Sequence, residues 1–322
     1  MKTRKLGWTD LELSTVGLGT WAIGGGGWQF SWGYQDDKES IAAILHAVEK
    51  GVNWIDTAAV YGLGHSEEVV GKALKELPGR PIIATKGCRV WDREGNITGS
   101  LKKGSIKKEI EASLKRLDTD VIDLYQIHWP VPEDDIEEGW SAVADAVKEG
   151  KIRYAGVSNF NVGHIERIKN IHPVASLQPP YSMIKSDVEM ELLGYCVANN
   201  IGVVVYSPMQ KGLLTGKFTK ERAETLSEED HRSMDPQFHE PELSINMKLV
   251  EGLREIAERN GKTAAQLAIA WVLRRHEVTS AIVGTRKPSQ IEETVMAGDW
   301  MLSEEDVKEI EFLLARRMEE LG

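Results

Sequence analysis

The sequence predicts an α/β fold of the (β/α)₈ TIM-barrel type that spans residues 1–322 as a single domain. Short apolar runs alternate with helical patterns eight times, which is the arrangement that closes into a parallel barrel. No Pro/Gly/Ser-rich linker or low-complexity tract interrupts the alternation. A doubly wound open sheet is the alternative, but it gives no reason for the pattern to stop at eight units. We therefore expect a closed barrel.

The individual elements follow from the hydrophobic periodicity of each segment. The expected strands are 16–19, 54–56, 82–86, 122–128, 154–158, 176–178, 202–206 and 281–283. The expected helices are 37–50, 66–77, 103–117, 136–148, 162–169, 188–199, 245–260, 263–274, 288–297 and 303–321. The C-terminal half thus carries extra helices. Two short strands around residues 7–10 predict an N-terminal β-hairpin.

Composition excludes several classes of function. The net charge of -11 argues against a nucleic-acid partner and against an anionic membrane surface, since both require a basic face. No stretch approaches the ~20 apolar residues of a membrane span, and the N-terminus lacks a secretory apolar run. The two cysteines are far apart, and the histidines lack metal-ligand spacing. We therefore expect a cytoplasmic protein without disulfides or a metal site.

Polar side chains end three consecutive predicted strands. Asp56, Lys86 and His128 each occupy the last inward-facing position of a strand, because side chains on one face recur with period two. Adjacent strands lie ~4.8 Å apart, so these three groups are expected to meet at one rim of the barrel. Tyr61 follows Asp56 in a turn of small residues. On its own, Asp56 could cap a helix, and its pairing with Lys86 could be purely structural.

Together these residue types predict proton transfer to a carbonyl group. The pKa of a free phenol is ~10, and a neighbouring ammonium such as that of Lys86 should lower it at Tyr61. Asp56 would keep the ammonium charged, and a neutral His128 could orient a carbonyl oxygen. The cluster contains a proton donor but no activated nucleophile. A hydride from a nicotinamide would complete the reaction.

The chain resembles the aldo-keto reductase superfamily over essentially its whole length. Seven motifs in order carry the resemblance: DTAAVYG at 56–62, ATK at 84–86, DLYQIHWP at 123–130, GVSNF at 156–160, QPPY at 178–181, YSPM at 206–209 and GTRKP at 284–288. Within the family it is most similar to the bacterial branch of stress-induced and inositol-locus reductases, through GTWAIGG at 19–25 and GLLTGK at 212–217. The resemblance implies a catalytic tetrad of Asp56, Tyr61, Lys86 and His128, with Tyr61 as the general acid in reduction and the base in oxidation.

The resemblance also implies an extended NADPH across the C-terminal face of the barrel. Ser158, Asn159 and Gln178 would hold the carboxamide, and Tyr206 would stack on the nicotinamide ring. The pyrophosphate and adenosine would be bound by Ser207, Met209, Gly212, Leu214, Gly216, Gly284, Arg286, Lys287, Gln290 and Glu293. Arg286 and Lys287 are the expected partners of a 2′-phosphate. Many relatives carry Arg where Gln290 stands and Asn where Thr294 stands, so NADH is also possible.

The predicted substrate is a small carbonyl compound. Several tryptophans follow barrel strands and indicate an aromatic entrance, with Trp21 and Trp129 expected nearest the carbonyl. The glycine run at 24–27 is not a dinucleotide fingerprint, since tryptophans and no helix follow it. The expected assembly is a monomer or a small homo-oligomer.

Two rival functions remain open at this point. The first is a nicotinamide-sensing regulatory subunit with little turnover, as in the potassium-channel β subunits that this family also resembles. The second is a barrel hydrolase with paired carboxylates, which requires a second acid at another strand end. Asp123 does not meet that requirement, because it lies on the face of its strand opposite to His128.

Overall fold

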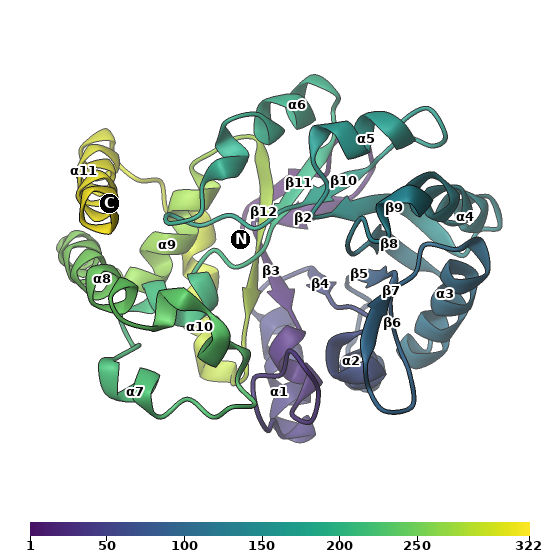
Figure 1. Ribbon diagram of the computed structural model, residues 1–322, viewed down its shortest axis with the longest axis horizontal. Coiled ribbons are helices and arrows are strands. Elements are labelled where there is room, and N and C mark those ends of the chain that lie inside the picture. Colours follow the sequence, from purple (N-terminus) through teal and green to yellow (C-terminus); the bar gives the residue numbers. More distant parts are fainter.

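The computed structural model describes residues 1–322 and confirms the predicted closed barrel. Eight strands form it, all hydrogen-bonded in parallel to their neighbours (Figure 1). In barrel order they are β3 (Val16–Gly19), β4 (Trp54–Asp56), β5 (Ile82–Gly87), β8 (Ile122–Ile127), β9 (Ile152–Ser158), β10 (Ser176–Gln178), β11 (Gly202–Val205) and β12 (Val278–Gly284). His128 therefore lies one residue beyond β8 instead of inside it.

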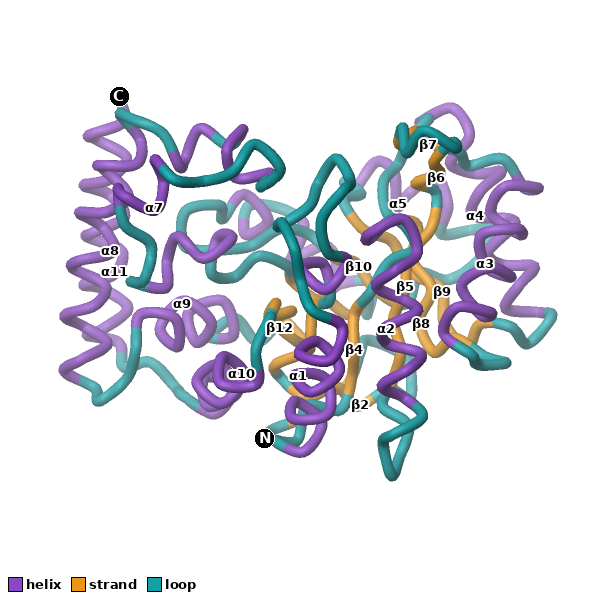
Figure 2. Tube along the Cα trace, turned by 90° about the horizontal axis from the view of Figure 1, so that it is seen from below, coloured by secondary structure: helices purple, strands orange, loops and turns teal.

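Helices surround the strands, and two long ones lie apart at one edge. The surrounding helices are α1 (Asp37–Glu49), α2 (His65–Leu74), α3 (Lys103–Leu117), α4 (Ile136–Lys148), α5 (Val162–Ile168), α6 (Leu192–Ala198), α9 (Ala264–Leu273) and α10 (Pro288–Val295). The outlying pair, α8 (Glu242–Arg259) and α11 (Glu304–Leu321), pack against each other (Figures 1 and 2). No helix of the chain has both the length and the apolar character that crossing a membrane requires.

Apolar side chains of the N-terminal hairpin and of the strands fill the end of the barrel opposite to the Asp56, Lys86 and His128 side chains. The predicted hairpin is present as β1 (Thr3–Lys5) and β2 (Glu12–Ser14), and its leucines join Trp54 and the inward side chains of the strands in one buried cluster. The indole Nε1 of Trp54 donates to Ser280 Oγ at 3.0 Å. A Cβ atom on Gly17 would lie 2.1 Å from the Trp54 ring, so this position has room only for glycine. With this end filled, polar groups gather at the opposite rim.

The two longest connections of the barrel, between β5 and α3 and between β11 and α8, contain structure that the hydrophobic pattern did not reveal. An antiparallel hairpin, β6 (Arg89–Trp91) and β7 (Ile97–Gly99), follows β5. The segment between β11 and α8 contains α7 (Lys220–Glu224) and several 3₁₀ turns. Elements this short carry too few residues for periodicity to identify them. Figure 2 shows the hairpin and α7 on the side of the barrel opposite to the N-terminus.

Candidate active site

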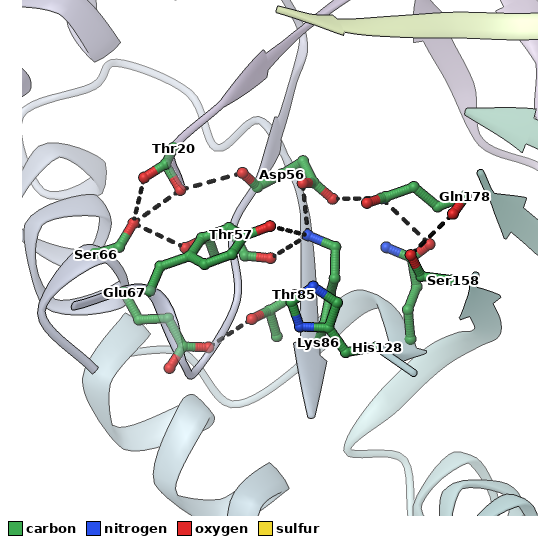
Figure 3. A network of polar contacts seen from close by, with 12 residues as sticks. Thr20, Asp56, Thr57, Ser66, Glu67, Thr85, Lys86, His128, Ser158 and Gln178 are labelled. Atoms are coloured by element: carbon green, nitrogen blue, oxygen red, sulfur yellow. Dashed lines mark hydrogen bonds and ion pairs between the residues drawn. The ribbon is translucent and has the colours of Figure 1, made fainter. Parts of the chain in front are cut away.

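The predicted strand-end cluster is assembled in the structure. Lys86 Nζ donates to Asp56 Oδ2 at 2.6 Å, to the Thr57 carbonyl at 2.8 Å and to Tyr61 Oη at 3.3 Å. The Lys86 side chain is fully buried, and that of Asp56 is 3% exposed. Figure 3 shows Lys86 reaching from its strand toward Asp56 and Thr57, with His128 beside it. The ammonium therefore links the carboxylate to the phenol.

Strand register and a close glycine contact place these groups. Asp56 pairs with Ala84 between β4 and β5, and the His128 N–H donates to the Gly87 carbonyl at 3.0 Å, which extends the β5–β8 ladder by one step. Tyr61 begins a 3₁₀ turn after β4. A Cβ on Gly62 would lie 2.1 Å from the carbonyl oxygen of Gly24. The glycine therefore lets the tyrosine turn pack directly against the first loop.

A second set of hydrogen bonds holds Asp56 from the far side of the barrel. Gln178 Nε2 donates to Asp56 Oδ1 at 2.8 Å, and Ser158 Oγ donates to the Gln178 carbonyl at 2.9 Å (Figure 3). The Thr20 N–H donates to the Asp56 carbonyl at 3.0 Å. Both carboxylate oxygens of Asp56 are thus occupied by protein donors. The carboxylate is a fixed counterion and is not available as a nucleophile.

The electrostatics at Tyr61 differ from the sequence-based expectation. Burial, together with the negative charge of Asp56, raises the pKa of the Tyr61 phenol well above its usual value. Burial also lowers the pKa of Lys86, although Asp56 opposes that shift. The predicted lowering of the phenol pKa by the ammonium was therefore wrong, because desolvation of the phenolate is the larger effect. Tyr61 is protonated at neutral pH, the state from which it can donate.

The imidazole of His128 is neutral and makes no hydrogen bond within the protein. Burial lowers its pKa well below the usual range, and the charges of Lys86 and Arg89 lower it further. Its Nδ1 is buried without a hydrogen-bond partner. Its ring lies 5.7 Å from that of Tyr61 in an edge arrangement. A buried imidazole without a partner, next to a protonated phenol, is suited to binding a ligand oxygen.

A cleft of about 430 Å³ opens over the cluster. Among the predicted site residues, it is lined by Trp21, Asp56, Tyr61, His128, Trp129, Ser158, Asn159, Gln178, Tyr206, Ser207, Met209, Gly212, Gly284, Arg286, Gln290 and Glu293. Lys86 lies buried beneath this surface. Leu214, Gly216 and Lys287 do not line the cleft; Leu214 is buried in the core, and Lys287 faces Glu39 at 3.8 Å.

One end of the cleft is aromatic. Trp21 stacks near Tyr61 at a ring distance of 6.2 Å, and Trp28, Phe30, Trp32 and Trp129 also line the wall. Trp91, at the end of β6, lies outside the lining. The Tyr206 hydroxyl donates to Asn159 Oδ1 at 2.8 Å, which fixes the phenol ring at the edge of the cleft. The wall can accommodate an apolar ligand body.

The opposite end of the cleft is cationic, and sequence reasoning found only part of it. The cations that line it are Lys211, Lys217, Arg222, Arg232 and Arg286. Burial lowers the pKa of the Arg222 and Arg286 guanidinium groups, and the nearby charge of Arg232 lowers both further. Arg232 forms a buried ion pair with Asp230 at 2.5 Å. Four of these cations come from the long segment after β11, where no repeating pattern announced them.

Neither the hydrolase rival nor a metal centre finds support in the geometry. Asp123 accepts from Arg80 at 2.6 Å and from Arg153 at 2.9 Å, as a structural ion-pair partner away from the cleft. The only carboxylates that line the cleft are Asp56 and Glu293, and Glu293 is bound by Lys217 at 2.5 Å. No three His, Cys, Asp or Glu side chains of the structure are grouped so that they could hold a metal ion.

Comparison with known proteins agrees with this geometry. The family model described as the aldo/keto reductase family matches residues 15–315. Aldo-keto reductase YhdN of Bacillus subtilis (strain 168) is 40% identical over 309 residues, covering 95% of this chain and 91% of the relative. The NADH-specific methylglyoxal reductase of Escherichia coli (strain K12) is 36% identical over 320 residues, covering 95% of this chain and 96% of the relative.

Solved structures support the same assignment. The glycerol dehydrogenase AKR11B4 from Gluconobacter oxydans superimposes with a TM-score of 0.90 at 37% identity, covering 98% of this chain and 96% of that chain. The match thus extends through the barrel, the long loops and the outlying helices. This chain belongs to the aldo/keto reductase family, whose members are oxidoreductases that use nicotinamide cofactors and act on small carbonyl compounds.

Proposed function

We propose that this enzyme reduces aldehydes or ketones to alcohols with NADPH, and that Tyr61 is the proton donor. The observation that carries the proposal is the buried chain from Asp56 through Lys86 to Tyr61, beside a neutral His128. Each member supplies a property that the others need. Removing Asp56 leaves the buried charge of Lys86 uncompensated, and removing Lys86 leaves the phenol without a stabilising ammonium.

The chemistry requires one proton and one hydride. The cofactor, when bound, supplies the hydride to the carbonyl carbon. His128 donates a ring N–H to the carbonyl oxygen and orients it, and Tyr61 transfers its phenolic proton to that oxygen as negative charge develops there. The C=O group thereby becomes an alcohol. Lys86, at 3.3 Å, stabilises the phenolate that remains, and Asp56 keeps Lys86 charged. In oxidation the same phenolate acts as the base.

The residues that line the cleft fit a nicotinamide nucleotide. Ser158, Asn159 and Gln178 line the cleft beside Asp56 and His128. Their amide and hydroxyl groups suit a carboxamide, which both donates and accepts hydrogen bonds. Tyr206 lies beside them with its ring held by Asn159. The cationic end, lined by the Lys and Arg side chains described above, suits phosphate groups. One elongated ligand would therefore satisfy both ends.

Preference for NADPH over NADH is supported by the charge at the cationic end. Arg232 lies close enough to lower the pKa values of both Arg222 and Arg286, and Asp230 offsets the charge of Arg232 itself. A dianionic 2′-phosphate would relieve this repulsion, whereas the neutral ribose hydroxyl of NADH would not. The Escherichia coli relative is NADH-specific by name. The cofactor preference therefore differs within the family and has to be measured for this chain.

Replacing Tyr61 with Phe tests the proposal. We expect kcat to fall by about 10²- to 10⁴-fold, because only the proton-donating hydroxyl is removed. The dissociation constant for NADPH, measured by titration of tryptophan fluorescence, should stay within about three-fold of wild type, because uniform binding is retained. The assay follows nicotinamide absorbance with a panel of aldehydes and ketones.

Tyr195→Phe is the matched control. Tyr195 lies on α6, and its hydroxyl donates to Glu166 at 2.5 Å, away from the cleft. We expect this variant to keep wild-type turnover. If Tyr61→Phe also kept it, the assignment of the proton donor would be wrong. Negligible turnover of the wild type with every carbonyl tested would instead favour the regulatory-subunit alternative.

A further inference from the structure

Arg89 is a cation of the active-site cleft that no other group of the protein neutralises. It is the first residue of β6, lines the cleft together with His128 and Trp129, and is partly buried. Its guanidinium makes neither a hydrogen bond nor an ion pair within the protein. Its charge contributes to the lowered pKa of His128, so it acts close to the imidazole.

The backbone at Arg89 is anchored beside the substrate wall. The preceding residue, Cys88, donates its N–H to Glu109 Oε2 at 2.8 Å, and its thiol donates to the Trp129 carbonyl at 3.1 Å. The Trp129 N–H in turn donates to Cys88 Sγ at 3.3 Å. Arg89 thus leaves the barrel rim at a fixed point next to Trp129. The backbone at Arg89 is therefore held in a fixed place at the wall of the cleft.

Near Asp56, Lys86 and His128 the cleft has two cations, Lys86 and Arg89, but one carboxylate, so Arg89 has no counterion. Asp56 is the only carboxylate that lines this end of the cleft, and Lys86 and Gln178 already occupy both of its oxygens. The other lining carboxylate, Glu293, is bound by Lys217 at the opposite end. An unpaired guanidinium in a partly buried cleft is costly unless a ligand supplies the anion.

We propose that Arg89 binds a carboxylate of the substrate, so that the preferred substrates are aldehydes or ketones carrying a carboxylate away from the reacting carbonyl. This inference rests on the proposed function and narrows its substrate class. A planar guanidinium matches a carboxylate with two parallel hydrogen bonds. The aromatic wall around Trp21 and Trp28 would accept the body of such a molecule. The phosphates of the cofactor have their own cations at the other end of the cleft.

A matched pair of substrates tests the proposal. The ratio of kcat/KM for 4-carboxybenzaldehyde to that for methyl 4-formylbenzoate is measured with NADPH in the wild type and in Arg89→Met. We expect the wild type to prefer the acid and Arg89→Met to reduce the ratio by about 10- to 100-fold, as for the loss of a charged hydrogen bond. The loss should appear mainly in KM, because the contact exists before the transition state as well as in it. Arg89→Lys should restore part of the ratio, because it keeps the charge but not the planar fork.

Arg93→Met is the matched control, because Arg93 lies in the turn of the same hairpin, outside the cleft lining, and is exposed. It should leave the ratio as in the wild type. An unchanged ratio in Arg89→Met, or a wild type that prefers the ester, would overturn the proposal.

Binding of the product alcohol separates this proposal from the proposed function. Dissociation constants for 4-(hydroxymethyl)benzoate and its methyl ester are measured on the NADP⁺-loaded protein by tryptophan fluorescence. Weaker binding of the acid to Arg89→Met, with a smaller change for the ester, supports the carboxylate site even if turnover is absent and the reductase assignment fails. Equal binding of the acid by wild type and Arg89→Met contradicts the site, whatever the turnover.

Discussion

The two ends of the cleft are built in different ways. At the end proposed to be catalytic, called the catalytic end below, Asp56 and Lys86 come from the tips of neighbouring strands, and both are almost fully buried. At the cationic end, Arg222 and Arg232 come from the long segment between β11 and α8, and Arg286 follows β12 and is held by the carbonyls of Trp32 and Tyr34. Strand register positions the first group, whereas contacts between loops position the second. The catalytic end should therefore tolerate substitution least, and the cationic end should mainly set affinity.

The largest expected effect is at the catalytic end. Asp56→Asn removes the counterion of a fully buried ammonium, so Lys86 can no longer stabilise the Tyr61 phenolate. We expect kcat to fall by about 10²- to 10⁴-fold and the free energy of unfolding by about 3–5 kcal/mol. Steady-state kinetics and urea unfolding measure the two effects. Asp10→Asn, which alters an exposed partner of Arg153, should change neither by a comparable amount. Equal losses in both variants would contradict the special role of the strand-tip pair.

An intermediate effect is expected at the cationic end. Arg286→Met should lower the ratio of kcat/KM for NADPH to that for NADH by about 10- to 100-fold, as for the loss of a charged hydrogen bond. The value of kcat should change little, because the phosphate is remote from the reacting atoms. Lys287→Met provides the comparison, since Lys287 is exposed, faces Glu39 and lies outside the cleft lining. A loss of selectivity in Lys287→Met as large as in Arg286→Met would contradict the assignment of Arg286, and not Lys287, to the phosphate.

The smallest expected effect concerns the support behind the catalytic end. Glu109 accepts from the Cys88 N–H at 2.8 Å, and burial raises its pKa from 4.5 to about 7. The folded state then binds the proton more tightly than the unfolded state does. The free energy of unfolding should therefore decrease as pH rises from about 4.5 to about 7. Above a pH of about 7 the whole destabilisation that comes from ionising Glu109 is present.

Glu109→Gln should remove this pH dependence. We expect the variant to be more stable than wild type by about 1–3 kcal/mol at a pH of about 8 and to differ little at a pH of about 5. Urea unfolding at the two pH values provides the measurement. Glu111→Gln, an exposed change on the same helix α3, is the control. A wild type and a Glu109→Gln variant with the same pH dependence would show that Glu109 does not titrate in this window.

Sequence periodicity was most informative where side chains are placed by strands. Asp56, Lys86 and His128 were predicted to meet because each ends an inward face, and the structure brings them together. His128 lies one residue past β8, yet its N–H continues the ladder, so the boundary error changed nothing at the site. The prediction succeeded because register between parallel strands is nearly independent of the loops.

Sequence reasoning was weakest where burial and loop packing decide. The pKa of Tyr61 was predicted to fall beside Lys86, but it rises because the surrounding barrel desolvates the phenolate. Arg89 and Arg232 were missed because they lie in segments with no repeating pattern. Lys287 was expected to bind the cofactor with Arg286; in the structure its ammonium lies 3.8 Å from Glu39, outside the cleft lining.

The sequence by itself determined the barrel, its N-terminal hairpin and the meeting of Asp56, Lys86 and His128, because a period-two pattern on parallel strands places the last inward side chains on one rim. Only the tertiary structure decided which cations face the cleft, which of them lack a counterion and which way the phenol titrates. Those properties depend on the distances between loops and on the water that each group loses, and neither is encoded in the spacing of residues along the chain.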